Sequence, residues 1–392
     1  MLFAIHLARK SLGRFALVLL APVMALVLSA CVPAGEGGAP APKGGKVTVA
    51  LLVPGGSGNA SDQIMADSLA NAARMAVADL GGGAQIDLKV YQTGGSPAMA
   101  ASLATQAADE GAQIILGPVY AAEANAVGVA MAPRGISVLA FSNNTAIAGG
   151  NVFVLGPTFE NSARRVAGYA VRQGKNRVMI VADKNTAGEA GSAAIQRGVA
   201  AVGGTVVAST SYEFSQSGIA AAAAGIVATA RSAEASALFL TADTAGALPV
   251  LSQSLVAAGL DTATMKFLGL TRWDIPSQTL SLPALQGSWF ALPDPNLYAQ
   301  FQSRYMSAYG AAPLPISGLA YDGIAAIGAL AKQGRDLSGG SLTQNAGFVG
   351  VSGIFRLRAD GSNERGLAIA EIRQGQAVVI DPAPRSFAGA GF

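Results

Sequence analysis

The sequence has 392 residues, of which 51% are apolar and 12% are charged. This composition excludes an intrinsically disordered protein, because disordered chains are poor in apolar residues and rich in charge. The net charge of +3 comes from 26 Lys and Arg residues against 23 Asp and Glu residues. The position of the basic residues decides what this small excess means.

The first 30 residues have the three parts of a secretory signal peptide. The basic residues here are Arg9, Lys10 and Arg14. An apolar run over 15–28 follows them, and two small residues end the segment. A membrane-spanning helix is the alternative, but it needs about 20 apolar residues and this run is shorter. We therefore expect a signal peptide over 1–30. The remaining chain would hold 23 basic and 23 acidic residues, which gives no reason to expect a nucleic-acid partner.

Cys31 is the only cysteine, and it ends the sequence L-S-A-C directly after the expected signal peptide. This ending resembles the lipobox of bacterial lipoproteins, in which cleavage precedes the cysteine and a lipid is attached to its sulfur. The resemblance implies a lipid anchor in a membrane. Val32 follows, where aspartate would retain a Gram-negative lipoprotein in the inner membrane, so the outer membrane is favoured. Residues 31–46 are rich in Gly, Pro and Ala, which predicts a flexible tether.

The remaining chain lacks the residues of common catalytic and metal sites. The only histidine, His6, lies in the expected signal peptide, and Cys31 would be blocked by its lipid. Ser-His-Asp and Cys-His catalysis and the usual zinc ligand sets are thereby excluded. The sequence also lacks phosphate-loop, dinucleotide-binding and nucleophile-elbow motifs. A carboxylate-pair hydrolase stays possible in principle, although no particular pair is indicated. We therefore expect no enzymatic activity, no cofactor and no metal.

Short apolar strands alternate with helical patterns between 47 and 142. Strands are expected at 47–53, 86–92, 112–117 and 136–142, and helices at 61–80, 97–110 and 122–134. Apolar strands separated by helices predict a parallel sheet that is covered on both faces.

The same pattern starts again after a joining segment at 151–160. Strands are expected at 176–183, 204–210, 236–243 and 265–271, and helices at 160–173, 188–202, 216–232, 245–258, 296–309 and 317–333. Residues 350–380 alternate with a period of two around two turns, as antiparallel hairpins do. The last residues, 383–392, are expected to form a flexible tail.

Several stretches resemble, in order, those of type I periplasmic binding proteins, and in particular the leucine/isoleucine/valine-binding branch. They include "VTVALLVPGGSG", "IILGPVYAAEANAV", "ISVLAFSNNT", "VMIVADKNTAGEAG", "FLTADTAGALPVLSQSLVAAG", "GSWFALPDP" and "GVSGIFRLRADGS". The resemblance covers 46–381. It implies two doubly wound α/β lobes joined by three crossings near 157, 293 and 337, with a small ligand held between the lobes. The first lobe would be 46–157 plus 294–336, and the second 158–293 plus 337–382.

Polar residues at the carboxyl ends of the expected strands are the candidate ligand contacts, because ligands of open α/β sheets bind there. The candidates are Ser57, Tyr120, Ser142, Asn143, Asn144 and Thr145 in the first lobe, and Asp183, Asp243, Thr244 and Trp273 in the second. The segment 142–145 suits a carboxylate or amide. Alternatively, Ser142, Asn143 and Asp243 cap turns or helices, and Asp183 bonds nearby backbone. Trp273 could close over a ligand or pack between the lobes.

The chain departs from the leucine-binding branch where that branch grips an amino acid. Ala121 and Ala122 stand where hydroxyl groups would meet the ligand carboxylate, and Ala187 stands where a tyrosine would cover it. Thr271 or Arg272 falls near the acid expected to pair with the ammonium group. A buried ammonium without a paired acid costs several kcal/mol, so a branched-chain amino acid is disfavoured.

Two functions follow from the resemblance. The first is a non-catalytic, periplasm-facing lipoprotein that binds a small polar, amino-acid-like ligand and delivers it to an ABC-type permease. The chain is also similar to penicillin-binding protein activators, lipoproteins of this fold that stimulate peptidoglycan synthases by contact. The second function is therefore regulation of peptidoglycan synthesis, with a penicillin-binding protein as the partner.

Overall fold

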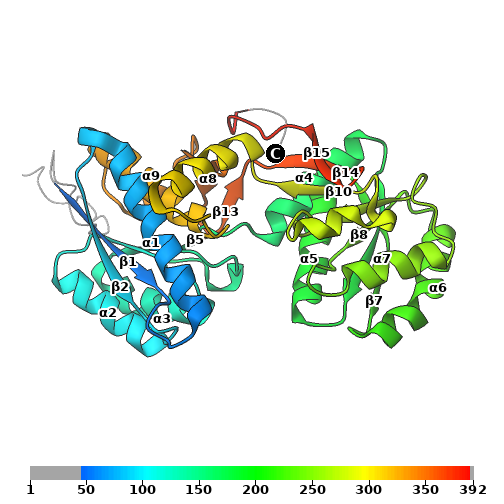
Figure 1. Ribbon diagram of the computed structural model, residues 1–392, viewed down its shortest axis with the longest axis horizontal. Coiled ribbons are helices and arrows are strands. Elements are labelled where there is room, and N and C mark those ends of the chain that lie inside the picture. The colour runs from blue at the N-terminus through cyan, green and yellow to red at the C-terminus, as the bar shows by residue number, and fades with distance from the viewer. Residues whose placement is uncertain (1–45, 389–392) are drawn as a thin grey trace, which may run out of the picture. The chain divides into compact units, whose positions relative to one another are not determined.

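The computed structural model describes residues 46–388, all of which belong to one unit by their contacts (Figure 1). Its first sheet is parallel, with the strand order β2-β1-β3-β4-β5. The strands are β1 (Val47–Val53), β2 (Ile86–Gln92), β3 (Ile114–Leu116), β4 (Ser137–Ala140) and β5 (Val152–Val154). The sequence pattern predicted the first four. The fifth, β5, lies in the segment that was expected only to join the two halves.

Helices cover both faces of this sheet because successive strand residues point to opposite sides. Val49 and Leu51 of β1 pack with α1 (Ala60–Leu80) and α9 (Ser317–Lys332), which lie side by side (Figure 1). Ala50 and Leu52 pack on the other face with α2 (Pro97–Asp109) and α3 (Ala121–Met131). Three short 3-10 helices, η1 (Gly81–Gly83), η2 (Ala132–Arg134) and η3 (Thr145–Ile147), complete this part.

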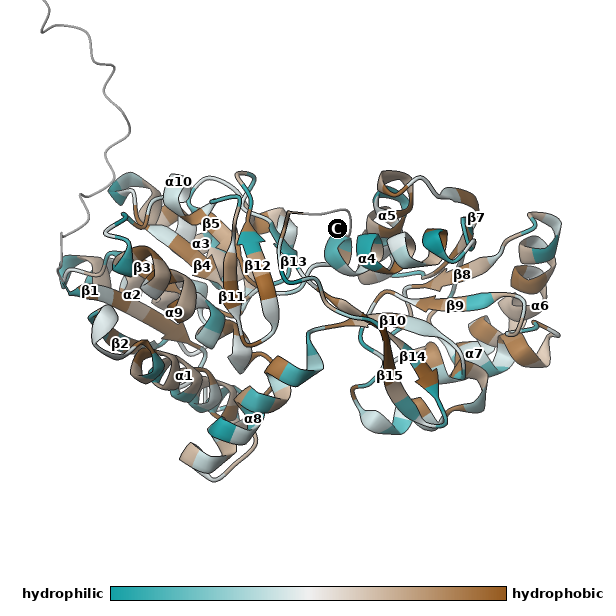
Figure 2. Ribbon diagram, turned by 90° about the horizontal axis from the view of Figure 1, so that it is seen from above, coloured by the Kyte–Doolittle hydropathy of each residue, from teal (hydrophilic) through white to brown (hydrophobic). Residues whose placement is uncertain are grey.

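The second sheet is mixed, with the strand order β15-β14-β10-β9-β8-β6-β7. The strands are β6 (Arg177–Asp183), β7 (Thr205–Tyr212), β8 (Ala237–Leu240), β9 (Lys266–Gly269), β10 (Trp289–Leu292), β14 (Ala368–Arg373) and β15 (Gln376–Asp381). The five strands β6 to β10 are parallel, and β14 and β15 add an antiparallel hairpin. Figure 2 shows β8 and much of β9 in the colours of hydrophobic residues, as expected of central strands.

Helices also cover both faces of the second sheet. Val178 and Ile180 of β6 pack with α4 (Phe159–Arg172) and α5 (Thr186–Ala201). Met179 and Val181 pack on the opposite face with α6 (Gln216–Ser232) and α7 (Leu248–Ala257). Two 3-10 helices, η4 (Ser277–Ser281) and η5 (Pro283–Leu285), precede β10. The expected α/β class with two separately wound sheets is confirmed.

A small antiparallel sheet shows that the third crossing between the lobes does not lie near 337, as the sequence predicted. Its strands are β11 (Phe348–Gly350), β12 (Gly353–Leu357) and β13 (Asn363–Arg365), and nearby helices are α8 (Pro295–Tyr309) and α10 (Gly339–Leu342). Phe348, Phe355 and Leu357 pack in the same core as α1 and α9, so this sheet belongs with the first lobe. After β13, Leu367 is the first residue along the chain that packs in the core of the second sheet. The third crossing therefore lies at Gly366, because a period-two pattern predicts strands but not the core they cover.

The other two crossings lie beside the expected positions. Leu155 packs in the core of the first sheet, and Phe159 packs against that of the second, so the first crossing spans 156–158. Leu292 ends β10 in the second core, and α8 begins at Pro295. Within 46–388, no helix combines the length and apolar character that a membrane span requires.

Candidate functional site

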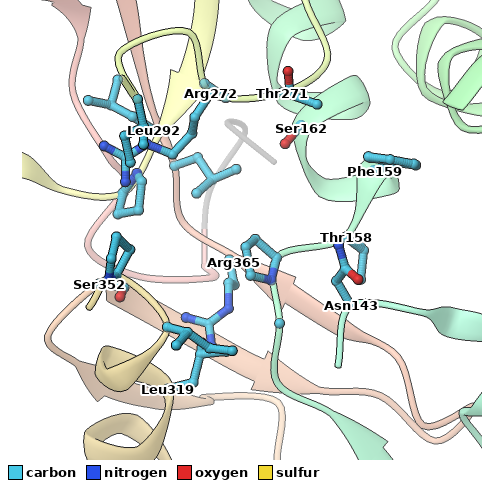
Figure 3. Close-up of a pocket in the computed structure, with 18 of the residues that line it drawn as sticks. Asn143, Thr158, Phe159, Ser162, Thr271, Arg272, Leu292, Leu319, Ser352 and Arg365 are labelled. Carbon is cyan, nitrogen blue, oxygen red and sulfur yellow. The ribbon is translucent and has the colours of Figure 1, made fainter. Parts of the chain in front are cut away.

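A cavity of about 480 Å³ lies where the three crossings meet the carboxyl ends of β4 and β9 (Figure 3). The crossings contribute Gly156–Thr158, Ala291–Pro293, Arg365 and Leu367 to its lining. Residues after β3, β4 and β9 form further walls. The rest comes from α4, α8, α9, the loop before α9 and the turn between β11 and β12. The position agrees with the rule that open α/β sheets bind ligands beyond the carboxyl ends of their strands.

The wall is apolar with a limited set of polar groups. Its apolar side chains include Phe141, Leu270, Ile275, Leu292, Ile316 and Leu319, and its hydroxyl and amide groups are Ser142, Asn143, Thr158, Ser162, Thr271, Tyr298 and Ser352. The charged lining residues are Arg272 and Arg365; none of the described lining residues is acidic. Figure 3 shows Arg272 on the side of Leu292 and Arg365 beside Leu319. Such a wall suits a small molecule with an apolar body and a few polar atoms.

Arg365 is held by the protein itself. Its Nε and Nη2 donate to the carbonyl oxygen of Leu155 at 3.0 and 2.6 Å, and its Nη1 lies 3.0 Å from Oδ2 of Asp322. Both side chains are almost completely buried, and the guanidinium also lies over the Phe355 ring. Burial raises the pKa of the Asp322 carboxyl, and Arg365 opposes this effect. Arg365 therefore ties β13 to the end of β5 and to α9.

Arg272 has a different set of contacts. Its Nε donates to Oδ1 of Asp274 at 2.9 Å, and its Nη2 donates to the other oxygen of the same carboxylate. Within residues 46–388, its Nη1 makes no hydrogen bond. This side-on pair fixes the guanidinium while leaving donors for a second acceptor, because a guanidinium carries five N–H groups.

Two hydroxyl groups of the lining are buried without a partner among the described residues: Oγ1 of Thr271 and Oη of Tyr298. Burial raises the pKa of Tyr298, and the nearby positive charge of Arg272 lowers it. An unsatisfied buried polar group costs about 1–3 kcal/mol, so such groups at a cavity wall indicate a missing acceptor or donor.

The sequence-predicted segment 142–145 is divided between the cavity and a cap. Ser142 and Asn143 line the cavity. Ser142 also accepts a hydrogen bond from the backbone N–H of Asn144, at 3.1 Å. Asn144 accepts one from Ala146 and caps η3, whose first residue is Thr145. The turn cap is therefore observed at Ser142, whereas ligand contact by Ser142 and Asn143 stays a prediction.

Ser57 and Tyr120 lie together outside the cavity lining, around Asp62 of α1. The Oγ of Ser57 donates to Oδ2 of Asp62 at 2.9 Å, and the Oη of Tyr120 donates to Oδ1 at 2.5 Å. The hydrogen bond to Asp62, followed by burial, raises the pKa of Tyr120 to about 12.

Replacing Asp62 with asparagine should return the pKa of Tyr120 toward the usual value of about 10. Because the folded pKa is raised, the stability that this bond supplies is present below pH ~10 and lost as the pH rises toward about 12. Tyrosine ring ¹³C chemical shifts measured against pH check this, with the Tyr120 signal assigned from Tyr120→Phe. An unchanged titration in Asp62→Asn would contradict the hydrogen bond.

The remaining candidates lie in the second sheet and its loops. Asp183 is buried and accepts hydrogen bonds from the hydroxyl groups of Tyr212 and Thr241. Asp243 accepts backbone hydrogen bonds from Gly246 and Leu248 through its carbonyl oxygen, and Thr244 donates to the carbonyl oxygen of Ile275 at 2.6 Å. None of these three is among the residues described as lining the cavity. Their contacts are those of capping and loop-fixing residues.

Trp273 neither closes over the cavity nor packs between the lobes, the two roles that the sequence suggested for it. It is fully buried in the core of the second sheet, packed against Phe290. It neither lines the cavity nor packs in the core of the first sheet. Its neighbours Thr271 and Arg272, which follow the end of β9, line the cavity instead. Ser162, Tyr298 and Arg365 carried no such signal, because each lies inside a regular element.

Within 46–388, no group of three or more His, Cys, Asp and Glu side chains could hold a metal ion. Cys31 lies outside the described residues.

Comparison with known proteins gives one family and many related structures. Residues 46–377 match the family described as periplasmic binding protein.

Several solved structures are similar in fold. A putative branched-chain amino acid ABC transporter from Rhodospirillum rubrum is 17% identical with a TM-score of 0.71, and the match covers 86% of this chain and 99% of that one. A Desulfitobacterium hafniense ABC transporter substrate-binding protein, in complex with Leu, has 17% identity and a TM-score of 0.62, covering 86% and 100%. A Rhodopseudomonas palustris BisB5 ABC transporter solute-binding protein, in complex with 3,4-dihydroxybenzoic acid, has 18% identity and a TM-score of 0.56, covering 87% and 98%. Such identities show a common fold. No curated protein matches the chain.

Proposed function

Because this chain belongs to the periplasmic binding protein family, we propose that it is a non-catalytic receptor that takes a small solute into the cavity and presents it to the permease of an ABC transporter. The observation that carries the proposal is the cavity itself. It lies at the three crossings, has an apolar wall, and is lined by Thr271 and Tyr298, whose hydroxyl groups are buried without partners among the described residues. The similar structures named above contain ligands as different as Leu and a hydroxylated benzoic acid, so the fold alone does not select the solute.

A thermal-shift screen of the full chain in mild detergent tests the proposal. The screen should include amino acids, amides, amines, short peptides, carboxylic acids and cell-wall fragments. A specific solute should raise Tm in a concentration-dependent way. At one hundred times its Kd it should add about 2.7 kcal/mol to the free energy of unfolding. A screen that is blank for every class, together with capture of a penicillin-binding protein by the full chain, would support synthase activation and refute solute transport.

The proposed location is the periplasm, with a lipid on Cys31 as the anchor. We expect the exported protein to incorporate radiolabelled palmitate and to fractionate with membranes, because two or more acyl chains anchor a protein stably in a bilayer. Cys31→Ser should abolish both the label and the membrane association while leaving the fold intact. Equal labelling of the two proteins would show that Cys31 is not the lipid site.

A further inference from the structure

We propose that the solute is a small carboxylate with an apolar body and no ammonium group, and that Arg272, Tyr298 and Thr271 bind its carboxylate. This inference rests on the proposed function and names the ligand class of the same cavity. It would separate this chain from receptors of zwitterionic amino acids.

The charges of the wall exclude an ammonium group. Both charged residues of the lining are arginines, and none of the described lining residues is acidic. Asp274 and Asp322 are each paired with one of those arginines, Asp274 with Arg272 and Asp322 with Arg365. A ligand ammonium in this cavity would therefore be desolvated next to positive charge, without a counter-ion.

The hydrogen-bond donors of the wall suit a carboxylate. Arg272 is oriented by Asp274 and keeps Nη1 unused within the described residues. The hydroxyl groups of Thr271 and Tyr298 are buried without partners among those residues. Two of these groups follow β9 and the third lies in α8, so elements of separate parts of the chain converge on the cavity. A ligand carboxylate offers up to four acceptor positions, which is enough for all three donors.

Arg365 is not the anchor of the ligand, although it also lines the cavity. Three of its nitrogens are used by Leu155 and Asp322, at distances of 2.6 to 3.0 Å. Its charge is neutralised by a buried carboxylate. Arg365 contributes shape and position, whereas Arg272 is the cation that stays open to a second partner.

The size and surface of the cavity define the rest of the ligand. Its volume of about 480 Å³ lies in the range of sites for small molecules, roughly 300–1,000 Å³. Phe141, Leu270, Ile275, Leu292 and Leu319 supply apolar surface around it. A branched aliphatic chain or a single aromatic ring would match these walls.

A matched set of probes tests the ligand class by calorimetry on the full chain in mild detergent. The set is 4-methylpentanoate, its amide 4-methylpentanamide, L-leucine, 3-methylbutylamine and phenylacetate. The first four share one branched body and differ in charge. We expect 4-methylpentanoate or phenylacetate to bind, the amide to bind at least about tenfold more weakly, and leucine and the amine not to bind. Tighter binding of leucine or the amine than of both carboxylates would overturn the ligand class and leave the proposed function standing. Failure of both carboxylates would also overturn the class, whereas a blank in the broad screen as well would refute the proposed function.

Variants of the wall test the assignment of the anchor. Arg272→Gln should weaken carboxylate binding by about 10- to 150-fold, the range expected for losing hydrogen bonds to a charged group. Tyr298→Phe should weaken it about tenfold, and Arg272→Lys should retain part of the affinity because it keeps the charge. Arg197→Gln is the matched control, since Arg197 is exposed and pairs only with Glu160 among the described residues. Circular dichroism and the Tm of the unliganded variants establish folding. Unchanged affinity in folded Arg272→Gln would overturn the assignment.

Discussion

Replacing Asp322 with alanine should lower the free energy of unfolding by about 3–5 kcal/mol, because it leaves the Arg365 guanidinium buried without its counter-ion. The Asp322 side chain is fully buried and that of Arg365 is 4% exposed. The substitution also removes the acceptor of the Val351 backbone N–H, which donates to Oδ1 of Asp322 at 2.8 Å. Urea unfolding followed by far-UV circular dichroism measures the effect.

An exposed ion pair provides the matched control for this experiment. Lys184 and Glu213 lie 2.6 Å apart, with 60% and 66% of their side chains exposed. Glu213→Ala should change the stability by less than about 1 kcal/mol, because solvent already screens that pair. Replacing Asp322 and Arg365 together by leucine and methionine should recover much of the loss. Equal, small effects of Asp322→Ala and Glu213→Ala would show that Asp322 is not essential to this core.

Replacing Trp273 with alanine should destabilise the protein by about 3–5 kcal/mol, because it opens a cavity in the core of the second sheet. The ring packs against Phe290, and a Cβ built on Gly269 would come within 2.6 Å of it. Among the described residues its Nε1 has no hydrogen-bond partner. Trp273→Phe should therefore cost less, since it removes an unsatisfied donor together with some volume. Thermal and urea unfolding measure both variants.

Fluorescence quenching tests whether Trp273 lies in the core or at a position where it would cover the ligand. The chain has two tryptophans, so Trp289→Phe leaves Trp273 as the only fluorophore of that type. Acrylamide should quench its emission weakly in the folded protein and strongly in concentrated urea. Strong quenching of the folded variant would contradict the burial of Trp273 and restore its role as a cover for the ligand.

The sequence predicts the strands and helices of this fold well where the apolar pattern is continuous. The run at 47–53 coincides with β1, and the helical pattern at 317–333 coincides closely with α9. It does not predict β5, whose three residues are too few to show a period, nor the core on which β11 to β13 pack. That choice depends on contacts with α1 and α9, which are distant in the chain. The limits of the two lobes accordingly shift from 337 to Gly366.

The candidate site is predictable only where strands end. Ser142 and Asn143 directly follow the end of β4, and both line the cavity. The same rule also selects Asp183, whose carboxylate is used by Tyr212 and Thr241. Strand-end position therefore does not separate ligand contacts from loop-fixing residues. Tyr298 could not be found in this way, because it lies in the first turn of the helix α8 and lines the cavity only through the folding of separate segments.

The hydrogen bonds around Arg365 also limit how the two sheets can swivel. Besides the bonds of Arg365 to Leu155, the Nδ2 of Asn363 donates to the carbonyl oxygens of Val154 and Gly156 at 2.9 and 2.8 Å. The first and third crossings are therefore hydrogen-bonded to each other where they leave the first sheet. Just beyond these bonds the first crossing continues with Pro157, whose ring restricts φ, and the third with Gly366, which lacks this restriction. We therefore expect any rotation between the two sheets to change the backbone angles of Gly366 more than the φ angle of Pro157.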